Sequence, residues 1–290
     1  MLCVPSAVAQ GTELYVHLGR GAEFRGIHWP RKTTVEHFPL KLALIKHLAL
    51  PLAMATLLLC SLAYWWLDNL AHEIFGTVLF SLIGCHVVRN RNGLIGMFSA
   101  SNGLSGAVSL VLHLLIIVAV VALLATSVLI SKSVFTLFTF RDNFYIRDIH
   151  WFVAYWVVIL VGTHVGVHWA RVMAMLGLVF KLNYQSTLRT IVLRIAAVLM
   201  AEYGIWSLSV LGTWTKLTFN HSLDFWDFTV AVAPFFAHWV AVLCLAATTA
   251  HYVMVVARVV VRRNALRTKT VSPGNGKTSV NPQITGFRER

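Results

Sequence analysis

The chain carries six long, strongly apolar segments, and these constrain its fold more than any other feature of the sequence. Each is long enough to cross the roughly 30 Å hydrocarbon core of a bilayer as an α-helix. Hydrophobic residues make up 58% of the chain and charged residues only 12%, whereas soluble domains average about 25% charged residues. We therefore predict an all-α integral membrane protein with six transmembrane helices. We place these helices at residues 43–66, 69–89, 105–131, 148–172, 188–213 and 233–261.

The regions outside the apolar segments are polar and basic. We predict an N-terminal cytoplasmic arm at residues 1–41, a transmembrane domain at residues 42–262 and a basic, disordered tail at residues 263–290. Of the 24 Lys and Arg residues, 20 fall on one side of the predicted membrane. The positive-inside rule then places both termini in the cytoplasm. The basic residues on the opposite side are Lys132, Arg141, Arg147 and Lys216.

Two histidine pairs lie inside these segments: His72 with His86, and His150 with His164. Each pair is 14 positions apart, which on an α-helix is about 21 Å of rise and returns the second imidazole to within about 40° of the first. The predicted orientation makes their two helices parallel, so that His72 is level with His150 near the outer surface and His86 is level with His164 near the inner surface. A histidine within a membrane span is costly without a partner. The four are candidate ligands of two stacked metal centres, and the alternative is a polar contact between helices.

Residues near the four histidines suit the surroundings of a porphyrin. Gly76 and Gly162 would leave room for a macrocycle face, and the alternative for both is close helix packing. Arg89 and Arg171 follow the inner histidines and are candidates to pair with propionates. The alternative for the arginines is ordinary anchoring on the cytoplasmic side.

Other ionisable residues in the apolar segments are weaker candidates. His168 follows His164 by one helical turn and is an alternative ligand in its place. Glu202 is the only acidic residue deep in the fifth predicted helix, and with His238 and His251 it is a candidate for a quinone pocket. Hydrogen bonding between helices is the alternative for Glu202, and core packing is the alternative for the two histidines.

The segments LAHEIFGTVLFSLIGCHVVRNRNG and DIHWFVAYWVVILVGTHVGVHWARVM resemble the histidine-bearing helices of membrane b-type cytochromes. The arrangement of two pairs is similar to the cytochrome b core of quinol-oxidising complexes, and the local pattern resembles the flavinylation-associated bacterial b-type cytochromes. This resemblance implies a four-helix di-haem bundle in the bacterial inner (plasma) membrane. It implies two b-type haems, one held by His72 with His150 and the other by His86 with His164.

The predicted function is transmembrane electron transfer through these two haems, as the cytochrome b subunit of an oxidoreductase system. The expected partners are membrane lipid and either a quinone pool or a redox protein that carries FMN or haem, and no nucleic acid is expected. The alternative is a histidine-lined transporter for a metal ion or a proton, without haem. A transporter would need acidic residues along its path, and only Glu202 lies deep enough in the membrane.

Overall fold

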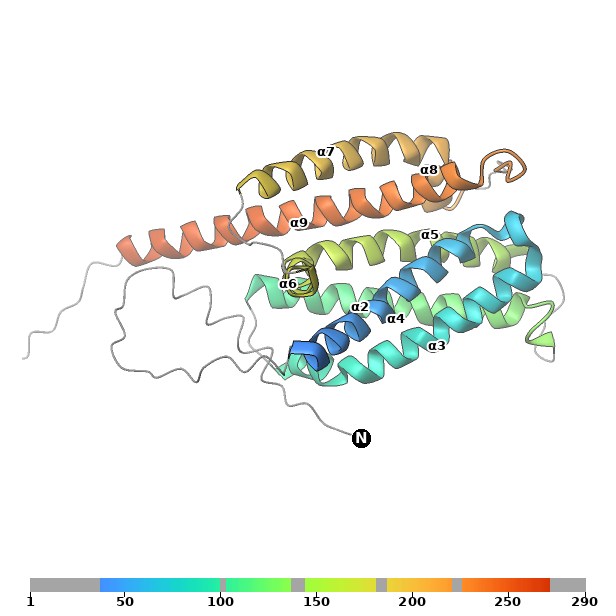
Figure 1. The fold of residues 1–290 in the computed structure, drawn as a ribbon, viewed down its shortest axis with the longest axis horizontal. Coiled ribbons are helices and arrows are strands. Elements are labelled where there is room, and N and C mark those ends of the chain that lie inside the picture. Colours follow the sequence, from blue (N-terminus) through green and yellow to red (C-terminus); the bar gives the residue numbers. More distant parts are fainter. Residues whose placement is uncertain (1–36, 100–102, 137–143, 181–186, 221–225, 272–290) are drawn as a thin grey trace, which may run out of the picture. The chain divides into compact units, whose positions relative to one another are not determined.

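The computed structural model describes residues 37–99, 103–136, 144–180, 187–220 and 226–271. The chain divides into two compact units, Met1–Leu40 and Lys41–Arg290. Within the described ranges the long regular elements are all helices, so the prediction of an all-helical protein is confirmed. These helices are α2 (His37–Leu62), α3 (Tyr64–Ser99), α4 (Leu104–Ile130), α5 (Phe144–Val167), α6 (Trp169–Phe180), α7 (Thr187–Val210), α8 (Thr213–Leu217) and α9 (Val232–Val271), as labelled in Figure 1.

Five of the described helices contain stretches that are long and apolar enough to cross a membrane. Many of their large apolar side chains point outward: Val118 is 67% exposed and Leu199 is 59% exposed. Such a surface is stable against lipid and not against water, so the chain is an integral membrane protein. In α2, the apolar stretch with described side chains, Leu48–Leu62, is shorter than a span. The five stretches are Tyr64–Gly96, Leu104–Ile130, Phe144–Val167, Thr187–Val210 and Val232–Asn264.

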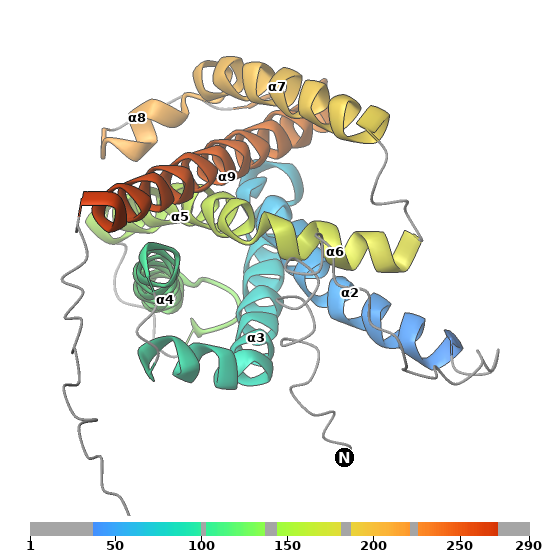
Figure 2. The same cartoon turned by 90° about the vertical axis from the view of Figure 1, so that its left-hand side faces the viewer.

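The central helix of the bundle is α5, which packs against α4 and α9, while α7 packs against α9 (Figures 1 and 2). Glycines make this close approach possible. A Cβ atom added to Gly162 of α5 would lie 2.8 Å from the Cβ of Ala246, and one added to Gly204 of α7 would lie 2.6 Å from the carbonyl oxygen of Ala241. Small residues at such contacts allow helix backbones to approach closely where no hydrophobic effect drives association.

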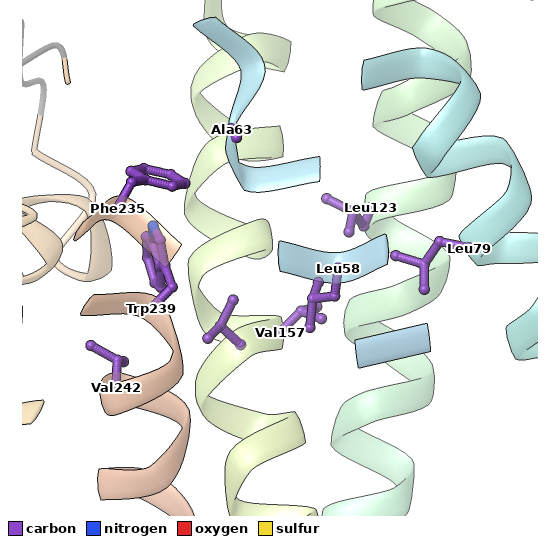
Figure 3. Packing of buried hydrophobic residues seen from close by; sticks show 9 residues of the cluster. Leu58, Ala63, Leu79, Leu123, Val157, Phe235, Trp239 and Val242 are labelled. Atoms are coloured by element: carbon purple, nitrogen blue, oxygen red, sulfur yellow. The ribbon is translucent and has the colours of Figure 1, made fainter. Parts of the chain in front are cut away.

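A cluster of buried apolar side chains joins α2, α3, α4, α5 and α9 (Figure 3). Val158 and Val242 are fully buried, and Trp239 is only 1% exposed. The Trp239 ring meets the ring of Tyr155 edge-on, with centroids 5.1 Å apart. Its buried members Leu79 in α3 and Val157 in α5 lie about two helical turns after His72 and His150.

Several predicted helix boundaries agree with the structure. The predicted helix at 105–131 corresponds to α4 within one residue at each end. The predicted start at residue 69 coincides with a break in α3, where Asp68 has a φ of 70°. The Asp68 carboxylate accepts a hydrogen bond of 2.7 Å from the backbone N–H of Asn69, which gives a partner to one N–H group at the start of the long part of the helix.

The predicted helix at 148–172 is wrong at its end, because the chain forms two helices there. α5 ends at Val167, the chain turns at His168, and α6 then runs across the direction of α5 (Figures 1 and 2). The turn keeps a backbone hydrogen bond from the His168 N–H to the His164 carbonyl, at 3.2 Å. An apolar pattern alone does not show such a turn, because both helices are rich in apolar residues.

The two ends of the chain also differ from the prediction where they are described. α2 begins at His37, inside the predicted arm, and residues 1–36 lie outside the described part of the chain. α9 continues to Val271 and therefore extends into the predicted tail at residues 263–271. Residues 272–290 lie outside the described residues.

Candidate functional site

His72 of α3 and His150 of α5 lie side by side, although 78 positions separate them in the sequence. Their ring centroids are 6.1 Å apart and their planes are inclined by 71°. Two metal–nitrogen bonds of about 2 Å, with about 1.1 Å from each nitrogen to its ring centroid, separate two imidazoles on opposite sides of one metal ion by about 6 Å. The observed distance therefore suits a shared metal ion. We call these two residues the His72–His150 site.

Hydrogen bonds orient both imidazoles of this site. The Nδ1 atom of His72 is 2.8 Å from the carbonyl oxygen of Ser61. The Nδ1 atom of His150 is 3.2 Å from Oγ1 of Thr126, and this hydroxyl itself donates to the carbonyl oxygen of Ala122 at 2.9 Å. Both Nδ1 atoms are therefore assigned as donors, which leaves both Nε2 atoms to act as ligands. Metal-binding histidines commonly have such a partner on the second nitrogen.

A cavity of about 660 Å³ adjoins the two histidines, which both line it. This volume lies within the range of about 300–1,000 Å³ found for ligand pockets. Gly76 is also on the wall, and a Cβ atom added there would meet no atom within 4 Å. Much of the wall is aromatic, with Tyr64 edge-on to His72 at 5.2 Å between centroids. The cavity can therefore hold a large, flat and mostly apolar ligand.

Three basic residues line the same cavity: Arg147, Lys216 and Lys132. Lys216 is the most buried of them, at 7% exposed, and its Nζ atom lies 4.7 Å from the centroid of the Trp151 ring. Burying an ammonium group is costly unless charges or ring faces compensate for the lost water. These cations suit a ligand that carries carboxylates, such as the propionates of a haem.

Glu73 is a further site residue that the sequence prediction missed. Its carboxylate accepts hydrogen bonds from the backbone N–H groups of Lys132 at 2.7 Å, Ser133 at 3.0 Å and Val134 at 2.7 Å, and from the hydroxyl of Ser131 at 2.8 Å. Successive N–H groups that converge on one anion form a strong local site for negative charge. Glu73 thereby ties the segment after α4 to α3, directly beside His72. The sequence signal that could have identified Glu73 is that an acidic residue follows a candidate ligand directly within an apolar segment.

The other predicted pair, His86 with His164, is arranged differently. Among the described residues, no ring contact is found between His86 and His164. The His164 ring instead lies 4.8 Å from the ring of His113 and 4.8 Å from the ring of His168. One candidate ligand nitrogen from each of these three residues lies within 4.8 Å of the others. We call His113, His164 and His168 the three-histidine cluster.

His86 lies near this cluster without belonging to it. It is half-buried on α3, where the side chain of Asn90 approaches its ring at 3.4 Å. It interacts electrostatically with both His113 and His164. The structure therefore places His86 and His164 at the same end of the bundle. It also brings His168, the alternative ligand, and His113, which the sequence did not single out, against His164.

The predicted arginine and glycine partners fall at different places. Arg171 is on α6 beyond the turn, and it interacts electrostatically with His164 and His168. Arg89 is exposed on α3 and interacts electrostatically with His86. Gly162 faces α9, which is the helix-packing alternative for this residue.

The environment of His168 favours its neutral form. Burial is the main cause, and the nearby Arg171, His113 and Arg258 add to it, so that the pKa of His168 is lowered to about 4. An imidazole must be neutral to offer a lone pair to a metal ion. His168 can therefore act as a ligand throughout the neutral pH range.

The candidates for a quinone pocket are not brought together. His238 is buried, with its Nδ1 atom 2.8 Å from Oγ of Ser207 and its ring stacked on Tyr203 at 5.1 Å between centroids. Glu202 is exposed on α7, and His251 is half-buried farther along α9. No hydrogen bond or ring contact joins these three residues to one another within the described ranges.

Comparison with known proteins gives no match among family models, curated proteins or solved structures. The class of protein is therefore defined by the fold and by the histidines. In its described part the chain is an all-helical integral membrane protein with two groups of histidines, one between α3 and α5 and one formed by α4, the end of α5 and the turn that follows it.

Proposed function

We propose that the chain is a transmembrane electron-transfer protein that holds two b-type haems, one with His72 and His150 and the other with His86 and His164. The observation that carries this proposal is the His72–His150 site. It combines a centroid distance of 6.1 Å, hydrogen-bonded Nδ1 atoms on both rings and an adjoining cavity of about 660 Å³.

At this site each group of the chain has a role that follows from its position. His72 and His150 offer their Nε2 atoms to one metal ion, and the Ser61 carbonyl and the Thr126 hydroxyl hold the two rings in place. Lys216 and Arg147 bind carboxylates of the ligand, and the aromatic wall excludes water. When bound, a haem would supply one-electron redox chemistry. With both imidazoles as its ligands, the site would suit electron transfer and not oxygen binding.

The second haem is proposed on the spacing of 14 positions along both helices. This spacing puts the two centres about 21 Å apart, far enough to span most of the hydrocarbon core. One centre would leave a wider gap for electrons to cross. The His164 ring must turn from His113 towards His86 to complete this pair. His168 remains the alternative ligand, and Arg89 and Arg171 the candidate partners of propionates.

In the proposed topology α2 is the first of six spans, and the site belongs to a four-helix di-haem bundle formed by α2, α3, α4 and α5. The distribution of the 24 basic residues, 20 of them on one side, supports cytoplasmic termini. The resemblance of the two histidine-bearing segments to bacterial b-type cytochromes supports placement in a bacterial inner membrane. It also supports a role as the cytochrome b subunit of an oxidoreductase system, with a quinone or a flavoprotein as the partner.

The experiment that tests the proposal is a haem count on the purified full-length protein, by pyridine haemochrome and by the spectrum after reduction with dithionite. We expect two b-type haems per chain. The variant His113→Ala is the matched control, because His113 is not a proposed haem ligand, and it should keep both. A colourless wild-type protein would overturn the proposal. One haem per chain would overturn the second site and leave the first.

A histidine-lined transporter for a metal ion or a proton is the second candidate function. The three-histidine cluster favours it, since neutral imidazoles bind transition metals. Glu202, the acidic residue on which a membrane path would depend, is exposed on α7 and does not line the described cavity. The haem count separates the two functions, because a transporter of this kind is colourless.

A further inference from the structure

We propose that His113, His164 and His168 form a binding site for a divalent transition-metal ion such as Zn²⁺ when no haem occupies this end of the bundle. The site draws on α4, on the last turn of α5 and on the turn between α5 and α6. One ligand nitrogen from each residue lies within 4.8 Å of the others. The three histidines come from two distant segments, so the cluster is produced by tertiary packing.

The nitrogens are close to the separation that a metal ion requires. An ion with bonds of about 2.0–2.1 Å in tetrahedral geometry holds its nitrogen ligands about 3.3 Å apart. The three rings therefore need to approach one another by at most about 1.5 Å, which rotation about the side-chain bonds can provide. Three protein nitrogens leave a fourth position for water or another small ligand.

Hydrogen bonding in the cluster leaves ring nitrogens that can bind a metal ion. The Nδ1 atom of His113 is 2.5 Å from the carbonyl oxygen of Ser109, so this nitrogen is the donor and Nε2 is free to bind a metal. The Nδ1 atom of His164 is buried and has no hydrogen-bond partner among the described residues. A buried polar nitrogen without a partner is unfavourable, and a metal ion bound to this nitrogen would give it a partner.

Two nearby arginines affect which fourth ligand the metal ion would take. Arg171 and Arg258 interact electrostatically with His168, and Arg258 donates from Nε to Oγ of Ser105 at 3.0 Å. Both arginine side chains are exposed, so solvent weakens their repulsion of a cation. Their charge favours an anionic fourth ligand, such as hydroxide or chloride. Neutral imidazoles select Zn²⁺, Co²⁺, Ni²⁺ or Cu²⁺ over the hard cations Mg²⁺ and Ca²⁺.

The metal ion and the second proposed haem exclude one another, because both take His164. This part of the proposal rests on the proposed function, whereas the metal site itself does not. His113 separates the two occupants: it is a ligand in the metal site and has no role in the haem site. His86 is the converse case: it is a ligand of the proposed haem and has no role in the metal site.

The test is equilibrium dialysis of the full-length protein in detergent against ZnCl₂, followed by elemental analysis, on protein purified from haem-replete and from haem-depleted cells. We expect one Zn²⁺ per haem-depleted chain. His113→Gln and His168→Gln should each weaken the binding by about tenfold or more, while His86→Gln and the matched control His251→Gln leave it unchanged. The haem-replete protein should bind no Zn²⁺ at this site.

Each result has a distinct meaning. Binding that is insensitive to both His113→Gln and His168→Gln overturns the metal site, and the haem count remains as the test of the proposed function. Zn²⁺ binding that needs His113 in a chain that already holds two haems confirms the metal site. The same result overturns the exclusion and the assignment of His164 as a haem ligand. Monodisperse elution of each variant from a sizing column shows that the variants are folded.

Discussion

The two ends of α3 and α5 carry histidines with the same spacing, yet their surroundings differ. At the His72–His150 site, both Nδ1 atoms are hydrogen-bonded and a cavity with buried and half-buried cations adjoins the rings. In the three-histidine cluster, the Nδ1 atom of His164 has no partner among the described residues. Equal spacing along a helix therefore does not produce equal sites. The partners that orient a ligand come from α2 and α4, whose positions the spacing does not specify.

The largest expected effect comes from removing one ligand of the His72–His150 site. His72→Ala and His150→Ala should each abolish the same proposed haem, because the remaining imidazole would be its single protein ligand. The measurement is the haem count together with a redox titration that resolves the two centres. If the two variants lose different haems, the pairing across α3 and α5 is wrong.

The next prediction sharpens the comparison at the other end. His164→Ala should abolish the second haem, and His168→Ala should leave it in place, because only His164 repeats the 14-residue spacing of the first pair. The same haem count and redox titration apply. Loss of this haem in His168→Ala but not in His164→Ala would show that His168, and not His164, is the ligand.

Glu73→Gln should lower the stability of the His72–His150 end. A glutamine has one acceptor oxygen and an NH₂ group, so it cannot replace a carboxylate that accepts from three backbone N–H groups. Hydrogen bonds to charged groups contribute about 1.5–3 kcal/mol each, and we expect a loss of about 2–3 kcal/mol and a lower Tm. Tm is measured by thermal unfolding in detergent. Glu202→Gln, on the exposed face of α7, is the matched control and should change the stability by less than about 0.5 kcal/mol.

An equal fall in Tm for the two glutamate variants would show that Glu73 has no special role in holding the segment after α4. Such a result would remove one of the differences between the two ends of the bundle.

The smallest expected effect comes from the buried cation. Lys216→Met approximately keeps the length of the side chain and removes its positive charge. Removal of this charge would favour the oxidised form of a nearby haem. We expect the midpoint potential of the first haem to fall by about 60 mV, equivalent to about 1.4 kcal/mol for one electron, while the potential of the second haem stays the same. Lys216→Arg should retain most of the wild-type potential. Equal shifts at both haems would contradict a local role for Lys216.

The sequence by itself determined the membrane class and most of the described spans. α4 is predicted to within one residue, because a long and mostly apolar segment ends at Ser131 and Lys132. The separation of two histidines along one helix could also be predicted from the sequence, since the rise per residue is a property of a single helix. These features are local, and a bilayer strengthens them by requiring every backbone polar group in a span to be paired within the helix.

Only the tertiary structure decided which side chains meet. The contact between Glu73 and the segment after α4, the approach of His113 to His164 and the turn at His168 depend on how the helices rotate and pack against one another. Hydropathy does not encode that rotation, because lipid-facing and helix-facing positions are both apolar in this chain. Gly162 shows the consequence: its sequence context allowed a porphyrin contact or a helix contact, and the position of α9 decided for the helix contact.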